Sequence, residues 1–165
     1  MPEIQIHPAT TPEDIAAVRR LMQAYGEHLA AHPSGAASIC LEGYACELER
    51  LPEGYETLLL ATVDGAPAGC VALRSLALEE PSCEMKRLWV ASEFRGHGLG
   101  RRLIAEAIAW AKQAGYTAMY LDTVPAAMPE ANQLYKNAGF VPADRYNKSN
   151  IPNIAYFRKG LITSQ

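Results

Sequence analysis

A glycine-rich turn carries the clearest chemical signal in the sequence. The stretch Arg95-Gly96-His97-Gly98-Leu99-Gly100-Arg101 holds three glycines in five positions, directly before an expected helix. Glycine lets a backbone approach a ligand closely, and the first N–H groups of a helix have no partner within it. The helix dipole and the charges of Arg95, Arg101 and Arg102 favour an anionic ligand there. The turn therefore predicts a phosphate or pyrophosphate site; the alternative is a tight turn with solvated arginines.

Spacing limits which phosphate ligand the turn can hold. The sequence lacks the P-loop pattern G-x-x-x-x-G-K-[ST]. The dinucleotide fingerprint G-x-G-x-x-G is one position longer than Gly96-x-Gly98-x-Gly100. Asp122 ends the next expected strand, about where a ribose-binding acid would lie in a dinucleotide-binding fold. However, such a fold opens with repeated strand–helix units, and in this sequence strands dominate before the turn. A nicotinamide or flavin enzyme is therefore the weaker hypothesis.

The same stretch resembles the signature of the GNAT superfamily of acetyl-CoA-dependent N-acetyltransferases. That signature, [R/Q]-x-x-G-x-[G/A], matches Arg95–Gly100, and Leu88–Arg95 resembles the family's lead-in from strand to turn. A second stretch, Glu130–Phe140, resembles the family's later helix, with its Asn, its Tyr and a closing Gly-Phe. The resemblance runs from residue 3 to near residue 160 and is closest from Glu84 to Phe140.

The resemblance implies that acetyl-CoA is the co-substrate. The amides from Gly96 to Arg101 would hold the pyrophosphate, and the strand edge at Leu88 and Val90 would pair with the amide-rich pantetheine arm. An amide near Val90 would polarise the thioester carbonyl, and Asn132 would hydrogen-bond the arm from the opposite side. The cofactor-binding residues implied in this way are Leu88, Trp89, Val90, Arg95, Gly96, His97, Gly98, Leu99, Gly100, Arg101 and Asn132.

Tyr135 lies where the family places its general acid. A thiolate with a pKa near ~8.5 leaves in the reaction, and a phenol is a suitable proton donor to it. The alternative is a packing role, because Tyr135 shares a helical face with Ala131 and Ala138.

Glu84 is the candidate general base. A lysine-like amine, with a pKa near ~10.4, arrives as an ammonium ion and must lose a proton before it attacks. Some family members use a carboxylate at the position of Glu84, directly or through a water. Regular strand alternation would place Glu84, Lys86, Leu88 and Val90 on one face, so an ion pair between Glu84 and Lys86 is the alternative.

Metal binding is not predicted. His28 and His32 are four residues apart on an expected helix, but Leu29 stands where H-E-x-x-H needs a glutamate, and no third ligand is evident. The cysteines have unrelated spacings without a C-x-x-C pair, which indicates buried thiols in a reducing compartment. These cysteines are Cys40, Cys46, Cys70 and Cys83.

Composition narrows the class of protein further. The chain has 165 residues, a net charge of −3 and 49% hydrophobic residues, which predicts one globular domain over residues 1–165. The acidic balance argues against a nucleic-acid or anionic-membrane binder. No apolar run reaches the ~20 residues of a membrane span, and the start lacks the pattern of a signal peptide. We therefore expect a cytoplasmic protein.

The elements that must position these residues form an α/β (α+β) pattern. Helical periodicity, caps and glycine stops predict about four helices, near residues 12–31, 44–50, 99–114 and 129–138. Alternating or apolar runs predict six to seven strands, near residues 4–6, 57–63, 69–75, 83–90, 116–122, 140–141 and 154–157. The resemblance implies a mixed, mostly antiparallel twisted sheet.

Together these features predict an N-acetyltransferase that works by direct attack of a primary amine on acetyl-CoA in a ternary complex. The acceptor would lie between the first two helices and the segment Asp144–Pro152, whose mixed charges favour a small polar molecule or amino acid. Three alternatives stay open: a catalytically silent acyl-CoA sensor, an enzyme acting on proteins or peptides, and a toxin acetylating aminoacyl-tRNA, against which the net charge counts. Homodimers through edge strands are frequent among proteins of this type.

Overall fold

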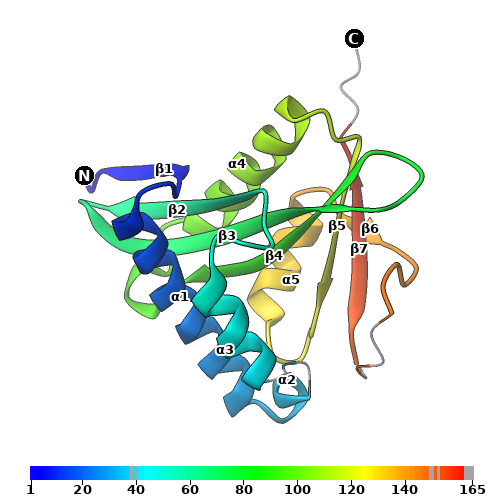
Figure 1. The fold of residues 1–165 in the computed structure, drawn as a ribbon, viewed down its shortest axis with the longest axis horizontal. Coiled ribbons are helices and arrows are strands. Elements are labelled where there is room, and N and C mark those ends of the chain that lie inside the picture. The colour runs from blue at the N-terminus through cyan, green and yellow to red at the C-terminus, as the bar shows by residue number, and fades with distance from the viewer. Residues whose placement is uncertain (38, 40, 149–150, 152, 162–165) are drawn as a thin grey trace.

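The computed structural model describes residues 1–37, 39, 41–148, 151 and 153–161, and is built around a mixed sheet (Figure 1). Seven strands pair in the order β1-β2-β3-β4-β5-β7-β6. Every neighbouring pair is antiparallel except β4 and β5. The strands are β1 (Ile4–Pro8), β2 (Thr57–Val63), β3 (Ala66–Leu76), β4 (Ser82–Val90), β5 (Ala118–Thr123), β6 (Val141–Pro142) and β7 (Ala155–Gly160).

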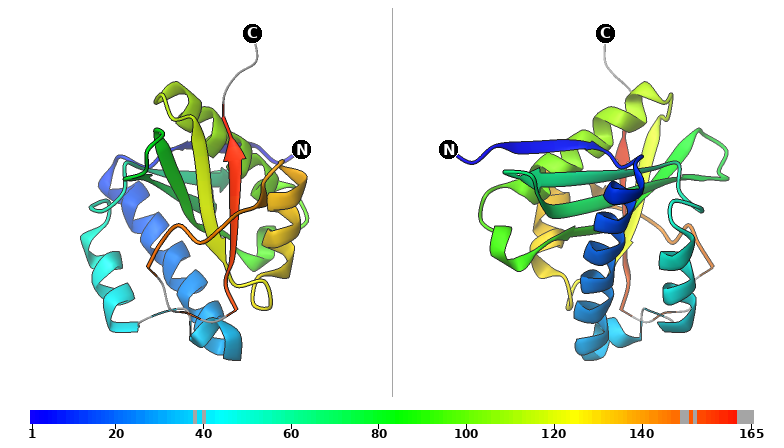
Figure 2. Two further views of the ribbon diagram at one scale, coloured as in Figure 1. Left: turned by 90° about the vertical axis from the view of Figure 1, so that its right-hand side faces the viewer. Right: turned by 60° about the vertical axis from the view of Figure 1, so that its left-hand side comes forward.

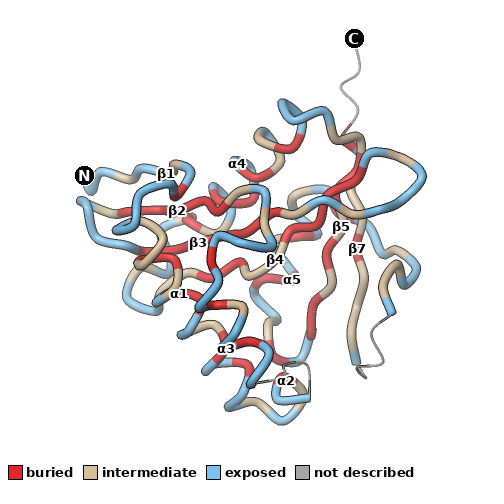
Figure 3. The backbone as a smooth tube through the Cα atoms, viewed as in Figure 1, coloured by how far each residue is buried: buried red, intermediate tan, exposed pale blue. Residues whose placement is uncertain are grey.

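Helices cover both faces of the sheet. The α-helices are α1 (Pro12–Ala31), α2 (Pro33–Ala36), α3 (Leu41–Arg50), α4 (Leu99–Gln113) and α5 (Pro129–Asn137), and a short 3-10 helix spans Ser92–Phe94. The two views of Figure 2 show α1 and α3 on one face and α4 and α5 on the other. Two main hydrophobic cores result, one beneath each pair of helices, and the central strands are buried between them (Figure 3).

Local signals set the ends of several elements. The Thr11 side chain accepts a hydrogen bond from the Asp14 amide, 3.1 Å, so that it caps α1 with Pro12 as the first helical residue. Asp64 and Gly65 both have positive φ, as the two-residue hairpin between β2 and β3 requires. The fold class predicted from the sequence is confirmed.

Element bounds differ from the sequence prediction in a few places. The short helix α2 and the 3-10 helix at Ser92–Phe94 were not expected, and α3 begins at Leu41 rather than at Tyr44. Short helices and helix starts depend on one or two hydrogen bonds, which periodicity does not reveal. Within the described residues, none of the helices has the length and apolar character needed to cross a bilayer.

A β-bulge interrupts β4. Arg87 has a φ of +61°, and the pairing with β3 shifts register between Cys70 and Ala72, where the partners are Trp89 and Lys86. Two β4 residues therefore face one residue of β3 at this point. The extra residue reverses the alternation of side chains along the rest of the strand.

The bulge overturns one expectation about the site. Leu88 belongs to the core beneath α4, and Val90 packs against that core. Glu84 and Lys86 alternate with Cys83 and Met85 of the same core, so they point to the α1 and α3 face instead. The prediction that all four share one face is wrong, because period-2 alternation holds only in a strand without a bulge.

The sheet opens between β4 and β5. These strands pair only over Ser82–Glu84 and Ala118–Tyr120. Beyond that point β4 continues beside β3, and β5 continues beside β7. The two strands diverge in the middle of the sheet (Figure 1), and we refer to the place where they part as the opening between β4 and β5.

Candidate active site

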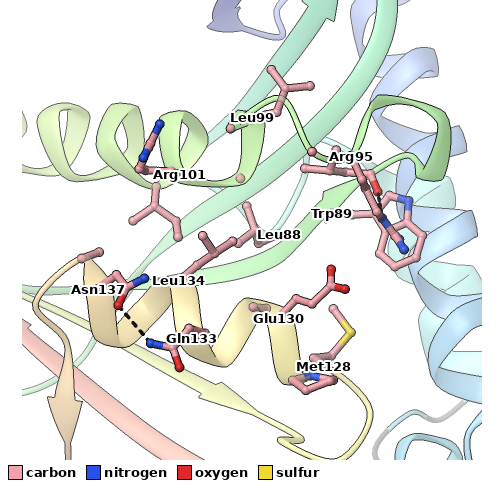
Figure 4. Close-up of a pocket in the computed structure, with 18 of the residues that line it drawn as sticks. Leu88, Trp89, Arg95, Leu99, Arg101, Met128, Glu130, Gln133, Leu134 and Asn137 are labelled. Carbon is pink, nitrogen blue, oxygen red and sulfur yellow. Dashed lines mark hydrogen bonds between the residues drawn. The ribbon is translucent and has the colours of Figure 1, made fainter.

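A cavity of about 830 Å³ lies between α4, α5 and the end of β4 (Figure 4). Leu88 and Val90 of β4 contribute to its floor, and Leu134 extends from α5 towards them. The cavity reaches the glycine-rich turn at one side and Trp89 and His28 at the other. The predicted cofactor residues that line it are Leu88, Trp89, Val90, Arg95, Gly96, Gly98, Leu99, Gly100 and Arg101.

The N-terminus of α4 faces this cavity. Gly96 and Gly98 have φ of +86° and +76°, a backbone conformation in which side chains are strained, and Gly98 is the helix cap. No side chain caps the helix, so its first amides are open to a ligand. His97 is exposed and does not line the cavity, so only its backbone can contribute to the turn.

Trp89 and Arg95 form one end of the cavity. The Arg95 guanidinium lies 4.7 Å from the centre of the Trp89 ring, and its Nε donates to the Val90 carbonyl, 3.0 Å. The Trp89 Nε1 atom is buried and has no hydrogen-bond partner among the described residues. A buried donor without a partner costs about 1–3 kcal/mol, and a ligand oxygen in the cavity would satisfy it.

These features fit the elongated, phosphate-bearing coenzyme A. The helix N-terminus and Arg101 suit the pyrophosphate. The unpaired strand edge beyond the last β4–β5 pair suits an arm rich in amides. A Cβ atom at Gly100 would lie 2.8 Å from Leu134 Cδ1, so glycine keeps α4 and α5 close at the cavity wall.

The structure places Asn132 away from the cavity. Its Nδ2 donates to Thr123 Oγ1, 3.1 Å, and to the Met128 carbonyl, 2.8 Å, which fastens α5 to the end of β5. Asn132 does not line the cavity and lies instead beside a second hollow between α5, β6 and β7. The expectation that Asn132 hydrogen-bonds the pantetheine arm stays a prediction, in which only the side-chain carbonyl oxygen is available, because both N–H groups are used within the protein.

Tyr135 is buried on α5, with its ring against Phe140 and Phe157. Burial raises the pKa of its phenol, and the nearby Tyr25 and Asp122 raise it further. The phenol therefore keeps its proton at neutral pH, as a proton donor must. Both the packing and the acid hypotheses for Tyr135 agree with this environment.

Glu84 is buried on the α1 and α3 side of the opening, with 1% of its surface exposed. Its Oε1 accepts from Arg74 Nε, 2.7 Å, and its Oε2 accepts from the Tyr146 hydroxyl. Lys86 is farther away, with Nζ 4.0 Å from Oε1. Arg74, which the sequence analysis did not single out, is therefore the main ionic partner of Glu84.

Asp122 also faces this opening. Asn147 Nδ2 donates to its Oδ2, 2.8 Å, and the charge of Asp122 contributes to the raised pKa of Tyr25, Tyr135 and Tyr146. The sequence analysis weighed Asp122 only as a ribose ligand. The position of Asp122 at the end of an expected strand marked it as a candidate, but the sequence could not show which other strand lies next to that one.

A second ionic group lies deeper beneath α1 and α3. Arg87, at the bulge, donates two hydrogen bonds to Glu47, 3.0 and 3.1 Å, and its guanidinium lies 4.9 Å from the Tyr44 ring centre. Burial alone would raise the pKa of Glu47, but the hydrogen bonds from Arg87 and Tyr55 lower it. The bulge thus aims Arg87 into a site where its charge is compensated.

The segment after β6 covers the opening. It crosses in front of β7 and β5 in the left view of Figure 2. Tyr146 packs on Tyr120, with ring centres 5.0 Å apart, and bonds Glu84, while Asn147 holds Asp122. This is the segment predicted to border the acceptor site; its residues 149, 150 and 152 lie outside the described residues.

The two helix histidines have other partners. His28 Nε2 is 2.9 Å from the Ala127 carbonyl oxygen, and His32 Nδ1 accepts from the Ser34 amide, 3.1 Å. In the part of the chain that the structure describes, no three His, Cys, Asp or Glu residues are grouped as metal ligands. Cys70 and Cys83 are buried free thiols and Cys46 is exposed; Cys40 lies outside the described residues.

Comparison with known proteins identifies the family to which this site belongs. The model of the Acetyltransferase (GNAT) family matches residues 18–140. A protein of Schizosaccharomyces pombe, named only as an uncharacterized N-acetyltransferase, is 42% identical over 94 residues, which cover 57% of this chain and 56% of that protein. The chain belongs to the GNAT acetyltransferase family.

Solved structures share the fold. An acetyltransferase of the GNAT family from Staphylococcus aureus matches with a TM-score of 0.77 and 17% identity, over 97% of this chain and 100% of that one. A GNAT family N-acetyltransferase from Escherichia coli, solved in complex with CoA, matches with a TM-score of 0.67 and 22% identity, over 98% and 83%. The chain spans 56% and 35% of the length of the two curated relatives it matches.

Proposed function

We propose that this chain is an N-acetyltransferase, with residues 1–165 as one catalytic domain, which moves the acetyl group of acetyl-CoA to a primary amine of a small polar molecule or an amino acid. The observation that carries the proposal is the cavity beside the open N-terminus of α4, with the end of β4 in its wall. A polar cluster around Glu84 lies on the opposite face of the sheet, near the place where β4 and β5 part. Family membership and the relatives named N-acetyltransferase support it.

The reaction is a single displacement at the acetyl carbon. The amine nitrogen forms a bond to that carbon while the carbon–sulfur bond breaks. The bound ammonium group first gives one proton to a base, and the nitrogen loses a second proton as the amide forms. The leaving thiolate gains one proton, so one proton is released overall. Products are the N-acetyl amine and free coenzyme A, and no covalent enzyme intermediate is needed.

Residues on both sides of the opening would serve this displacement. The amides at the start of α4 would hold the pyrophosphate, and Tyr135, whose phenol keeps its proton at neutral pH, would protonate the thiolate. Glu84 is the proposed base. Because both of its oxygens are occupied by Arg74 and Tyr146, we expect the proton to reach it through the Tyr146 hydroxyl or a water.

The first experiment separates an enzyme from a binding protein. Calorimetry measures acetyl-CoA binding, and an amine panel is screened by thiol release, with the acetylated product identified by mass spectrometry. Binding with turnover of at least one amine supports the proposal. Binding without any turnover identifies a sensor, and no binding at all rejects the family's co-substrate for this chain.

Variants then assign the chemistry. Tyr135→Phe removes only a hydroxyl, and we expect kcat to fall roughly 100-fold while acetyl-CoA affinity stays unchanged. Tyr116→Phe is the matched control, because the Tyr116 hydroxyl bonds Glu56 on a different part of the sheet. A Tyr135→Phe enzyme with wild-type kcat would leave Tyr135 a packing residue only.

A further inference from the structure

The acceptor side of the opening contains two opposite charges whose positions follow from strand register. Glu84 pairs with Tyr120 in the last parallel pair of β4 and β5. Continued by two residues, the same register sets Lys86 opposite Asp122 on one face of the sheet. The strands have diverged at that point, so Lys86 and Asp122 lie on the same face of the sheet on either side of the opening, and the charge of Asp122 acts on Lys86.

Lys86 has unused hydrogen-bonding capacity. Its side chain is 15% exposed, and its one ion-pair contact among the described residues is Glu84, 4.0 Å away, which is beyond hydrogen-bond distance. Burial lowers its pKa, against the opposing effects of Glu84 and Asp122. An ammonium group removed from water without acceptors is costly, and a ligand carboxylate would compensate it.

Asp122 is similarly half-satisfied. Asn147 bonds Oδ2, and Oδ1 accepts no hydrogen bond from the described part of the chain. The Tyr156 hydroxyl donates to Asn147 Oδ1, 3.3 Å, so a chain of polar groups orients this carboxylate. Asp122 also lies near enough to Tyr135 to contribute to its raised pKa. A cation bound at Asp122 would therefore lie beside the proposed acid.

The neighbouring charges are already engaged by the protein. Glu84 is held by Arg74 and Tyr146, and Glu47 is held by two N–H groups of Arg87. Arg74 is 43% exposed to solvent. Lys86 is therefore the positive charge of this cluster that is mostly buried without an acceptor within hydrogen-bond distance, and Asp122 keeps one oxygen for a ligand. One is positive and one is negative.

We infer that the acceptor is a free amino acid, whose ammonium group binds Asp122 and whose carboxylate binds Lys86. This inference rests on the proposed acetyl transfer and narrows its substrate class. A peptide N-terminus would have nothing to pair with Lys86, because the carboxyl group next to its amine is part of a peptide bond and carries no charge. Simple amines and protein tails are disfavoured for the same reason.

Matched acids and amides test the inference. Each amino acid is assayed beside its amide, with glycine and glycinamide, and β-alanine and β-alaninamide, covering two spacings of amine and carboxylate. We expect kcat/KM for the acid to exceed that for the amide by roughly 10-fold or more, because the amide cannot form the charged hydrogen bond with Lys86. Free amino acid binding is measured in parallel by calorimetry in the presence of coenzyme A.

Lys86 variants add a readout that a structural role would not change. Lys86→Met should raise KM for the amino acids and leave KM for their amides unchanged, so that the preference for acids over amides is lost. Lys86→Arg, which keeps the positive charge, should retain part of that preference. Asp122→Asn should weaken acids and amides alike, because both carry the ammonium group. Acetyl-CoA binding and thermal melting show that each variant is folded.

The outcomes separate the two proposals. Amides that are acetylated as well as acids, or a Lys86→Met enzyme that keeps the preference, overturn the amino-acid inference and leave acetyl transfer standing. Acetylation of other amines of the panel but of no amino acid overturns the inference alone. If no amine of the whole panel is acetylated by an enzyme that binds acetyl-CoA, the proposed function fails and the inference fails with it.

Discussion

A negative charge at the cap of α4 should strongly weaken acetyl-CoA binding. Gly98 has a φ of +76°, and a Cβ there would lie 3.3 Å from a terminal guanidinium nitrogen of Arg101. The carboxylate of Gly98→Glu would therefore neutralise Arg101 and stand among the amides that would receive the pyrophosphate. The change removes an attraction and adds a repulsion at the same place.

The expected loss follows from Coulomb's law. At a separation of ~6 Å and an effective dielectric constant of ~40, each unit charge contributes about 1.4 kcal/mol. The two charges of a pyrophosphate then give about 3 kcal/mol, which raises Kd roughly 100-fold. Calorimetry with acetyl-CoA measures this, and the loss should shrink at high salt, because exposed charges are screened.

Gly115→Glu is the matched control. Gly115 also has positive φ, +92°, and follows the other end of the same helix, where a Cβ would meet nothing within 4 Å. It shares the backbone strain of Gly98→Glu without the charge at the anion site. Equal loss of binding in both variants, or an unchanged Kd for Gly98→Glu, would refute the assignment of the α4 N-terminus as the phosphate site.

Two further predictions concern stability and thiol reactivity. Arg87→Met removes one partner of the buried pair between Arg87 and Glu47 and should lower the free energy of unfolding, measured in urea, by about 3 kcal/mol. The double variant Arg87→Met/Glu47→Gln should recover part of this loss. If the losses of the two single variants simply add in the double variant, there is no direct ionic coupling between the two side chains. Burial raises the pKa of Cys70 and of Cys83 to about 12. The stabilisation from keeping these thiols protonated is present below their unfolded pKa of ~9 and is lost as pH rises towards the folded value. Native protein at pH ~8.5 should therefore resist iodoacetamide at both, with labelling in urea; peptide mass spectrometry that finds either labelled in the native protein would count against the burial.

Local features of the fold were predictable from the sequence because their causes lie within a few residues. The cap at Thr11, the hairpin at Asp64 and Gly65, and the stop of α4 before Gly115 each depend on backbone preferences of one or two residue types. The anion site is also of this kind, since a helix start after glycines creates it wherever the chain goes afterwards. Nine of the eleven predicted cofactor residues line the cavity for this reason.

The exceptions show where local rules stop. Asn132 does not line the cavity, and its Nδ2 bonds Thr123 on β5, a contact that depends on how α5 is rotated against the sheet. The bulge at Arg87 has no signature in residue type, and it turned Leu88 and Val90 away from the face of Glu84. A shift of one residue in a strand exchanges its two faces.

The sequence by itself determined the elements, the glycine-rich turn at the start of α4 and the resemblance to an acetyltransferase, because each depends on short-range spacing. Only the tertiary structure decided which polar groups lie near the opening. Lys86 and Asp122 are 36 positions apart, and the parallel register of β4 and β5 sets them on one face of the sheet. That register is a non-local pairing set by the packing of the whole sheet between its helices, and no pattern within either strand specifies it.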